Sequence, residues 1–306
     1  MQIRLGYVAM SMNLENCSPS KTATVTILDK LEDNQNKINR LKHIAKENLQ
    51  NTLRILKYNK AKNIYVYRMS SKIFPLATYP GLEFTNYIDE LKPELINLGK
   101  YIMENKMRVS SHPDHFVLLN SISKKVYDDS VKELKYHQLM FEAMGLDANY
   151  KFVIHVGGMY KNKADSILRF YEGFNKLDAS LKQRLILEND DKSFNALDTL
   201  EICNKLKIPM VLDVHHHNCN KSDIELDRLL NLAFDTWDEQ KINPKIHFSS
   251  PKDTKNFRNH AEYINIDEFN KFIDVAKMVN RDFDIMLEAK QKDNALLELR
   301  KNVILP

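Results

Sequence analysis

Phe152-Val153-Ile154-His155 is the first of five short apolar runs in the second half of the chain that each end in a histidine, glutamate or aspartate. The other four runs are Leu185-Ile186-Leu187-Glu188, Pro209-Met210-Val211-Leu212-Asp213, Lys245-Ile246-His247 and Ile285-Met286-Leu287-Glu288. An apolar run of this length between polar residues is typical of a buried strand in a parallel sheet. Side chains that bind metal ions therefore recur at successive strand ends, and we expect them to converge on one point.

Three further runs precede these five, so the sequence predicts eight strands, at residues 3–9, 63–67, 107–111, 151–156, 184–188, 209–213, 245–248 and 283–288. Segments with helical spacing lie between them, at residues 38–57, 131–144, 164–177, 196–206, 224–237 and 266–278, and a last helix is expected after Asp293. This alternation favours the α/β class with a parallel sheet. Eight repeats in 306 residues match a (β/α)8 TIM barrel. An open doubly wound sheet is the alternative, but it would gather its site at one switch point and not from many strands.

Composition narrows the class of protein further. The chain is 43% hydrophobic and 28% charged with a net charge of +4, as expected for a soluble globular protein that tolerates a polyanionic partner. With only seven glycines it has no GxGxxG, GxxxxGK[ST] or GxSxG motif, so we expect neither a nucleotide cofactor nor a serine-hydrolase site. Three scattered cysteines and the lack of a signal peptide or a long apolar stretch predict a cytoplasmic protein without a membrane span. No linker-like segment divides the chain, so a single domain over residues 1–306 is expected.

Histidines are concentrated in the segments that follow the predicted strands, which hold eight of the ten. One histidine at a strand end is usually a structural residue, but here imidazoles and carboxylates recur together. Adjacent residues of an extended segment point in opposite directions, so His215, His216 and His217 are not all expected to face one site. A mixed imidazole and carboxylate set suits Mn, Fe or Zn, and so many ligands imply two or three ions. Such clusters hydrolyse phosphodiesters by activating water and stabilising the attacking and leaving oxygens.

Several motifs, in order along the chain, resemble the UV damage endonuclease family. They are Asn48-Leu49-Gln50-Asn51-Thr52-Leu53-Arg54, Tyr67-Arg68-Met69-Ser70-Ser71, His112-Pro113, His155-Val156-Gly157-Gly158, Leu187-Glu188-Asn189-Asp190-Asp191-Lys192, His247-Phe248-Ser249-Ser250-Pro251-Lys252 and Glu288-Ala289-Lys290-Gln291-Lys292-Asp293. The similarity runs from about residue 3 to the C-terminus.

The resemblance implies a TIM barrel related to endonuclease IV with a three-metal site, usually manganese, although zinc or another divalent ion would also fit. It implies an enzyme that nicks damaged double-stranded DNA immediately 5′ of UV photoproducts and some abasic sites and leaves a 3′-hydroxyl. The implied metal ligands are His112, His155, Glu188, Asp213, His216, His247, His260 and Glu288, with Glu188 as the bridging carboxylate. Lys245 matches a lysine that the family can carry in carboxylated form, and Tyr7 matches an active-site tyrosine near the lesion.

Two positions depart from the family pattern. His115-Phe116 stands where glutamine followed by tyrosine or phenylalanine is common, at a site that inserts into the duplex, and Tyr79 stands where histidine is common. Phe116 can still stack on bases, whereas His115 is shorter than glutamine and can become charged near neutral pH. Basic residues are expected to hold phosphates: Arg68, Lys72, Lys252, Lys255 and Arg258. A monomer acting on damaged DNA is expected. The alternatives are an abasic-site endonuclease like endonuclease IV, or a metal-dependent sugar isomerase or epimerase on the same barrel.

Overall fold

Eight parallel strands form one sheet in a computed structural model that describes residues 1–306. The neighbouring strands follow the order β3-β2-β1-β8-β7-β6-β5-β4. The strands are β1 (Ile3–Val8), β2 (Val66–Arg68), β3 (Arg108–Ser110), β4 (Phe152–His155), β5 (Leu185–Glu188), β6 (Met210–Asp213), β7 (Lys245–Phe248) and β8 (Phe283–Leu287). The two outer strands of this order, β3 and β4, meet through a bridge between Ser111 and Phe152, with backbone hydrogen bonds of 3.1 Å from the Ser111 amide to Lys151 and 2.9 Å from the Val153 amide to Ser111. The predicted (β/α)8 TIM barrel is confirmed.

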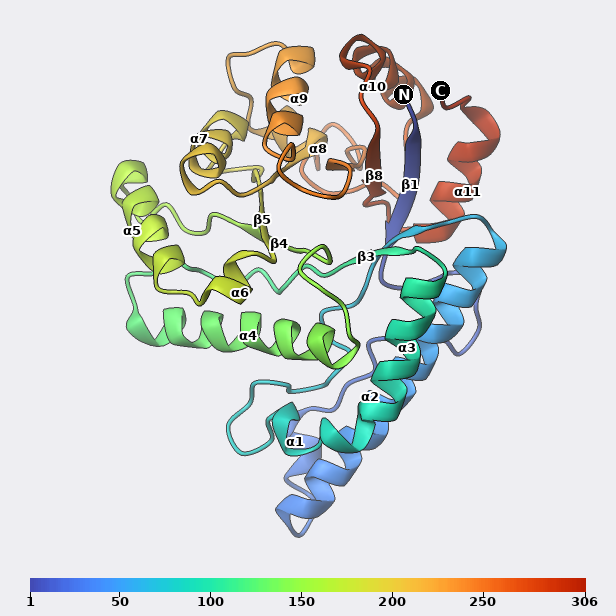
Figure 1. Ribbon diagram of the computed structural model, residues 1–306, viewed down its shortest axis with the longest axis vertical. Coiled ribbons are helices and arrows are strands. Elements are labelled where there is room, and N and C mark those ends of the chain that lie inside the picture. The colour runs from blue at the N-terminus through green and yellow to red at the C-terminus, as the bar shows by residue number, and fades with distance from the viewer.

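Helices follow the strands and surround them (Figure 1). The longer ones are α2 (Asn34–Ala61), α3 (Lys92–Glu104), α4 (Lys124–Ala143), α5 (Lys163–Asn175), α7 (Ala196–Leu206), α9 (Leu226–Asp235), α10 (Ile266–Val279) and α11 (Lys292–Asn302). Shorter ones are α1 (Val25–Leu28), α6 (Ala179–Lys182), α8 (Val214–Cys219) and the 3-10 turns η1 (Phe84–Asn86) and η2 (Asp89–Leu91). No helix is long and apolar enough to cross a membrane.

Short polar side chains start most of the long helices by accepting a hydrogen bond from the first turn. Asp33 accepts from the Asn36 amide ahead of α2, and Asn265 accepts from the Glu268 amide ahead of α10. Asn195 and Asp198 form a reciprocal capping box at α7. Each cap satisfies an amide that has no partner within the helix, which defines where the helix begins.

The barrel interior has three layers, because alternate residues of each strand point inward. At the amino ends of the strands, Asp284 is fully buried and accepts hydrogen bonds from Arg4 and Arg108. The middle layer contains Val153, Ile186 and Val211, which pack with Trp237 as a small apolar cluster. The next inward positions on the same strands, at the carboxyl ends, are His155, Glu188 and Asp213. The apolar layer thus separates the predicted ligands from the charged layer below.

Two local predictions were wrong. The helix α3 lies between β2 and β3, where no helix was predicted, and it packs beside α2 (Figure 1). His215, His216 and His217 belong to the short helix α8 and not to an extended segment, because the Asp213 side chain accepts a hydrogen bond of 2.7 Å from the His216 amide and caps the turn. Successive side chains therefore point about 100° apart and not in opposite directions.

Candidate metal centre

Glu188, the last residue of β5, lies at the centre of the predicted ligands and is 1% exposed. One carboxylate oxygen, Oε2, lies 3.1 Å from Nε2 of His112 and 3.7 Å from Nε2 of His155. The other, Oε1, lies 2.7 Å from Nδ1 of His247 and 3.7 Å from Nδ1 of His216. Imidazoles from four different βα units therefore meet at one carboxylate, with two on each oxygen.

Two groups of ligand atoms share Glu188. One group contains His112, His155 and Glu188, and the other contains Glu188, Asp213, His247 and Glu288, with the ligand atoms of each group within 4.8 Å of one another. His260 lies beside the second group, with its Nδ1 3.8 Å from Oε2 of Glu288. The structure thus brings all eight predicted ligands to the carboxyl ends of the strands.

Four of the histidines present the same ring nitrogen to a backbone carbonyl. Nδ1 of His112 lies 3.0 Å from the Pro113 carbonyl oxygen, and Nδ1 of His155 lies 3.3 Å from that of Glu188. Nδ1 of His216 lies 2.9 Å from the Asn189 carbonyl oxygen, and Nδ1 of His260 lies 2.8 Å from that of Glu288. A carbonyl can only accept, so Nδ1 carries a proton in each of these rings, which leaves Nε2 as the nitrogen that a metal ion could bind. This is the usual outer hydrogen bond of a metal-binding histidine, and it fixes both the ring orientation and the tautomer.

The carboxylates are packed too closely to be stable without positive charge. Burial would raise the pKa of Glu188, but the charges of His247 and His155 and the hydrogen bond from His112 outweigh it and hold the pKa well below its usual range. Burial raises the pKa of Asp213, whose Oδ2 is buried without a hydrogen-bond partner. Buried carboxylates and imidazoles arranged in this way fit divalent cations, which would compensate the negative charge and occupy the open lone pairs.

Glu288 is held from the opposite side by Arg68, which was expected to hold phosphates at the rim. The guanidinium of Arg68 donates a hydrogen bond to Glu288, and its side chain is only 12% exposed. Arg68 thus points into the barrel mouth, where it lines a hollow and contacts a predicted ligand, and its expected role in holding phosphate stays a prediction. Its inward position follows from β2, where Arg68 pairs in register with Val8 and Ser110.

Lys245 lies one layer below the ligands and is 1% exposed. Its Nζ donates a hydrogen bond of 3.1 Å to the hydroxyl of Ser110 and makes no ion pair. Burial, together with the positive charges of Arg108 and Arg68, holds the pKa of Lys245 well below its usual range. Its surroundings therefore favour the uncharged form of the amine.

Tyr7 is not brought to the mouth. It is 0% exposed, and its hydroxyl donates a hydrogen bond of 2.7 Å to the side chain of Asn59 in α2. Its neighbours Gly6 and Val8 take the inward positions of β1, so Tyr7 faces the surrounding helices, where it packs edge-on to Tyr67. The prediction that Tyr7 contacts a lesion is wrong for this chain. Alternate residues of a strand point to opposite faces of the sheet, and Tyr7 is on the face turned away from the barrel interior.

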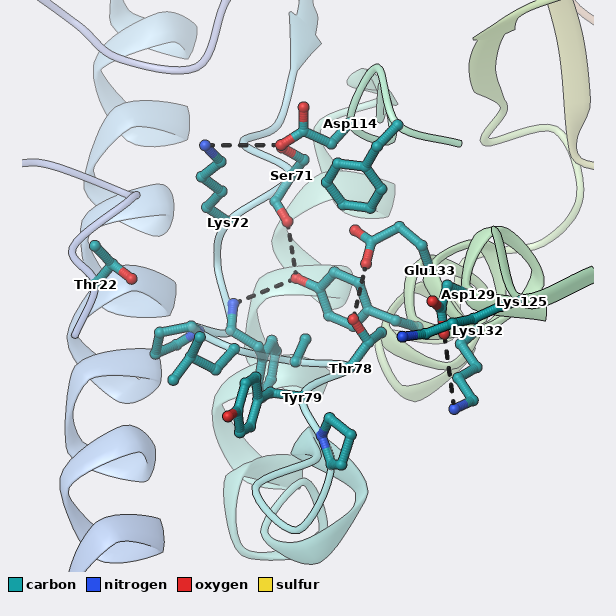
Figure 2. A pocket seen from close by; sticks show the side chains of 17 residues that line it. Thr22, Ser71, Lys72, Thr78, Tyr79, Asp114, Lys125, Asp129, Lys132 and Glu133 are labelled. Atoms are coloured by element: carbon teal, nitrogen blue, oxygen red, sulfur yellow. Dashed lines mark hydrogen bonds and ion pairs between the residues drawn. The ribbon is translucent and has the colours of Figure 1, made fainter. Parts of the chain in front are cut away.

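Three hollows run together across the mouth. The largest, of about 670 Å³, is shown in Figure 2, and Tyr79 and Phe116 are among the residues that line it. It shares Ser71, Lys72 and Asp114 with a second hollow of about 410 Å³ that reaches His112. The second shares His112 through His115 with a third of about 390 Å³ that reaches His155 and His216. The result is a groove that passes over one side of the ligand cluster.

The residues predicted to contact DNA line this groove or lie exposed in a neighbouring loop. Tyr79 is 42% and Phe116 is 47% exposed, while the side chain of His115 is 92% exposed and lies 2.8 Å from Asp114. Lys252 is exposed in the loop after β7, where its amide donates a hydrogen bond of 2.6 Å to Asn259 and so keeps the loop closed. These side chains are accessible to a large ligand, whereas three of the predicted metal ligands are buried and the other five are only partly exposed.

Asn189 is a site residue that sequence reasoning missed. It is fully buried next to Glu188, its side chain exchanges hydrogen bonds of 3.0 and 2.9 Å with the backbone of Asp213, and its carbonyl accepts from His216. It therefore sets the position of two ligands from the neighbouring strand. The only signal in the sequence is its place immediately after Glu188, within a motif already noted.

The family model of the UV-endonuclease UvdE matches residues 3–305. The chain belongs to this family. The UV DNA damage endonuclease of Bacillus thuringiensis subsp. konkukian is 45% identical over 97% of this chain and 93% of its own length. Its counterpart in Bacillus cereus strain B4264 is 44% identical over 98% of this chain and 94% of its own.

Solved structures agree with this assignment to the UvdE family. The crystal structure of SacUVDE superposes with a TM-score of 0.87 at 32% identity, covering 99% of this chain and all of that one. An AP endonuclease of family 2 from Brucella melitensis superposes with a TM-score of 0.52 at 10% identity, covering 97% of this chain and 98% of that one. The second likeness shows the barrel alone, so membership of the UvdE family rests on the closer matches.

Proposed function

We propose that this protein is a DNA repair endonuclease that hydrolyses the phosphodiester immediately 5′ of a UV photoproduct and leaves a 3′-hydroxyl. The observation that carries the proposal is the cluster of imidazoles and carboxylates around Glu188, in a chain that matches the UvdE family from end to end. Ligand groups that share a carboxylate are the arrangement that multi-metal phosphodiester hydrolases require.

Three divalent ions, manganese in preference to zinc, would be held by His112, His155, Glu188, Asp213, His216, His247, His260 and Glu288. When bound, such ions supply Lewis acidity toward water and phosphate oxygens. Glu188 would bridge two of them, since its two oxygens face different histidines. The carbonyls that hold the Nδ1 protons would keep the rings aimed at the ions without rearrangement.

Lys245 would act below this cluster as a carboxylated lysine. The unprotonated amine would attack the carbon of CO2, so that the nitrogen–carbon bond forms while one carbon–oxygen π bond opens onto oxygen, and the nitrogen would release one proton to solvent to leave a carbamate anion. The positive charges of Arg108 and Arg68, which together with burial lower the pKa of Lys245, would stabilise the anionic product. Protein exposed to 13C-labelled bicarbonate should show a carbamate 13C resonance that is absent in Lys245→Met.

Damaged double-stranded DNA would lie along the groove across the mouth. Phe116 and Tyr79 offer exposed rings for base stacking, while Lys252 and its neighbours Lys255 and Arg258 would hold phosphates. A photoproduct stacks and pairs poorly, so removing it from the helix costs less than the few kcal/mol that a normal base requires. Selectivity would then need no reading of sequence. We propose a monomer with no nucleotide cofactor.

The direct test is nicking of an end-labelled duplex that carries one photoproduct. We expect a metal-dependent product with Mn2+, none with EDTA, and none from the same duplex without the lesion. A cut 5′ of the lesion, with an end that DNA polymerase can extend, would support the assigned product. A duplex with an abasic site forms the third arm: cleavage of that duplex alone would reassign the protein as an abasic-site endonuclease.

A further inference from the structure

One face of α4 carries four polar side chains that point into the protein: Ser130, Glu133, Tyr136 and His137. All four are buried, with exposed fractions between 0 and 7%. Their spacing of three, three and one keeps them in one sector of the helix. Burying polar groups is costly unless each finds a partner, so the partners indicate what this face holds in place.

Two of the four side chains hold the loop after β2. The hydroxyl of Tyr136 donates a hydrogen bond of 3.2 Å to the Ser71 carbonyl and accepts one of 3.3 Å from the Phe74 amide. The hydroxyl of Thr78 donates a hydrogen bond of 3.3 Å to Oε2 of Glu133 (Figure 2). These three bonds attach both ends of the segment from Ser71 to Thr78 to α4, and Tyr79 follows directly.

The other two side chains hold the segment after β3. The hydroxyl of Ser130 accepts a hydrogen bond of 2.8 Å from the Leu118 amide, two residues beyond Phe116. Nδ1 of His137 lies 2.8 Å from the hydroxyl of Ser111, the residue before the ligand His112. The carboxylate of Glu133 lies 3.5 Å from Nε2 of His137 without a hydrogen bond between them, so the two sets of contacts are adjacent within α4.

The two segments held in this way form opposite walls of the same hollow. Tyr79 lies on the wall from the β2 loop and Phe116 on the wall from the β3 loop, with about 670 Å³ between them. Asn48 of α2 also holds the first wall, through a hydrogen bond of 2.9 Å to the Ile73 carbonyl, and the partly exposed Lys72 and Asp114 lie 3.7 Å apart, but α4 is bonded to both walls. An exposed ion pair of this length contributes little.

We propose that the polar face of α4 is a positioning element that fixes the spacing of the Tyr79 and Phe116 loops before DNA binds. The face is formed by Ser130, Glu133, Tyr136 and His137. The spacing of the two loops sets the preference for damaged over undamaged DNA. The inference rests on the proposed function for its substrate. Loops of this length are mobile by default, and a binder whose loops are already ordered does not spend binding energy on ordering them. Undamaged duplex, held through its phosphates, does not need the fixed spacing.

The test compares Tyr136→Phe and Thr78→Val with a matched control on the same helix. Each of the two variants removes a single hydroxyl with little change in shape. The control is Gln138→Met, because Gln138 is also buried and donates hydrogen bonds of 2.9 Å to Ser180 and 2.8 Å to Glu142, but it ties α4 to α6 and not to either loop. Dissociation constants would be measured with a photoproduct duplex and with the undamaged duplex, beside bound metal and melting temperature.

We expect Tyr136→Phe to weaken binding of the photoproduct duplex by about fivefold to tenfold, as for the loss of one or two neutral hydrogen bonds. Thr78→Val should show a smaller loss of the same kind. Binding of undamaged duplex and the metal content should be unchanged, and Gln138→Met should bind both duplexes like the wild type. A variant that weakens both duplexes equally, or a control that loses the same preference, would overturn the proposal.

A measurement without DNA separates this inference from the proposed function. Hydrogen exchange of residues 70–80 and 112–120 should be faster in Tyr136→Phe than in Gln138→Met at equal melting temperature, because only the first variant releases a loop. If the wild type has no preference for photoproduct DNA, the proposed function fails. If exchange in the two loops is unchanged by Tyr136→Phe, the positioning role of α4 fails, whatever the substrate is.

Discussion

Replacing Glu188 by glutamine tests the centre of the site with almost no change in shape. In the wild type, Oε2 of this carboxylate lies 3.1 Å from one imidazole nitrogen and 3.7 Å from a second. Oε1 lies 2.7 Å and 3.7 Å from the nitrogens of two further imidazoles. An amide keeps one oxygen and replaces the other by a donor, so it cannot bridge two cations and carries no charge. The ions on one side of the residue would lose a ligand and the net charge of the site would rise.

We expect Glu188→Gln to lower the nicking rate by at least about a thousandfold, equivalent to about 4 kcal/mol of barrier at 1.36 kcal/mol per tenfold. In the metal-free protein the change removes a charged acceptor from His112 or His247, and a hydrogen bond to a charged group contributes about 1.5–3 kcal/mol. A loss of about 2 kcal/mol corresponds to roughly 4–8 °C in melting temperature for a large domain. The fold should therefore persist at 25 °C.

The measurements are single-turnover nicking of an end-labelled photoproduct duplex, metal content by mass spectrometry and thermal melting with and without Mn2+. Glu262→Gln is the control, since Glu262 is an exposed carboxylate 3.8 Å from Lys290 on the same face of the barrel. Nicking by Glu188→Gln within tenfold of the wild type would refute the bridging role. Loss of nicking with unchanged metal content would show that Glu188 acts on the substrate and not on the ions.

Three further predictions concern other parts of the molecule. Phe116→Ala should weaken binding of photoproduct DNA by about 1–3 kcal/mol, the contribution of one base stacked on an aromatic ring, with kcat at saturating DNA much less affected; fluorescence anisotropy beside nicking would check this. Asp284→Asn leaves Arg4 and Arg108 without their buried carboxylate and should cost about 3–5 kcal/mol in urea unfolding. Burial and, to a smaller extent, the charges of neighbouring arginines lower the pKa of Lys151 to about 8. Between about pH 8 and 10.4 the unfolded chain therefore binds more protons than the folded protein, so the stability of the folded protein rises with pH through that window. Lys151→Met should remove that gain. The melting temperature of the variant minus that of the wild type should then be more favourable to the variant at pH 7 than at pH 9.5, and an equal difference at both pH values would contradict the assignment.

Much of the fold followed from local pattern, because a buried parallel strand needs a continuous apolar run and a crossover needs a helix. The strands of the structure overlap all eight predicted runs. The segment that became α3 was missed, although Pro93 near its start and Leu95, Leu98 and Ile102 at helical spacing were available signals. The start of α4 was also placed too late, since its first turn is polar and is begun by the cap at Ser123.

The ligands were predictable for a reason of topology. Parallel strands of a barrel all end at the same rim, so side chains at their carboxyl ends must converge whatever their partners are. The sequence by itself therefore determined the barrel, the edge at which the imidazoles and carboxylates gather and the types of residue found there.

Only the tertiary structure decided which way individual side chains face. Tyr7 and Arg68 lie on adjacent strands near the same rim, yet Tyr7 packs against α2 while Arg68 turns inward to Glu288. The difference is one residue of strand parity, which is set by register with neighbouring strands that lie far away in the chain. In the same way the cap at Asp213 sets the helical phase that brings His216, and not His215, toward Glu188. Local pattern cannot carry this information, because register and phase are fixed by contacts that exist only after the barrel has closed.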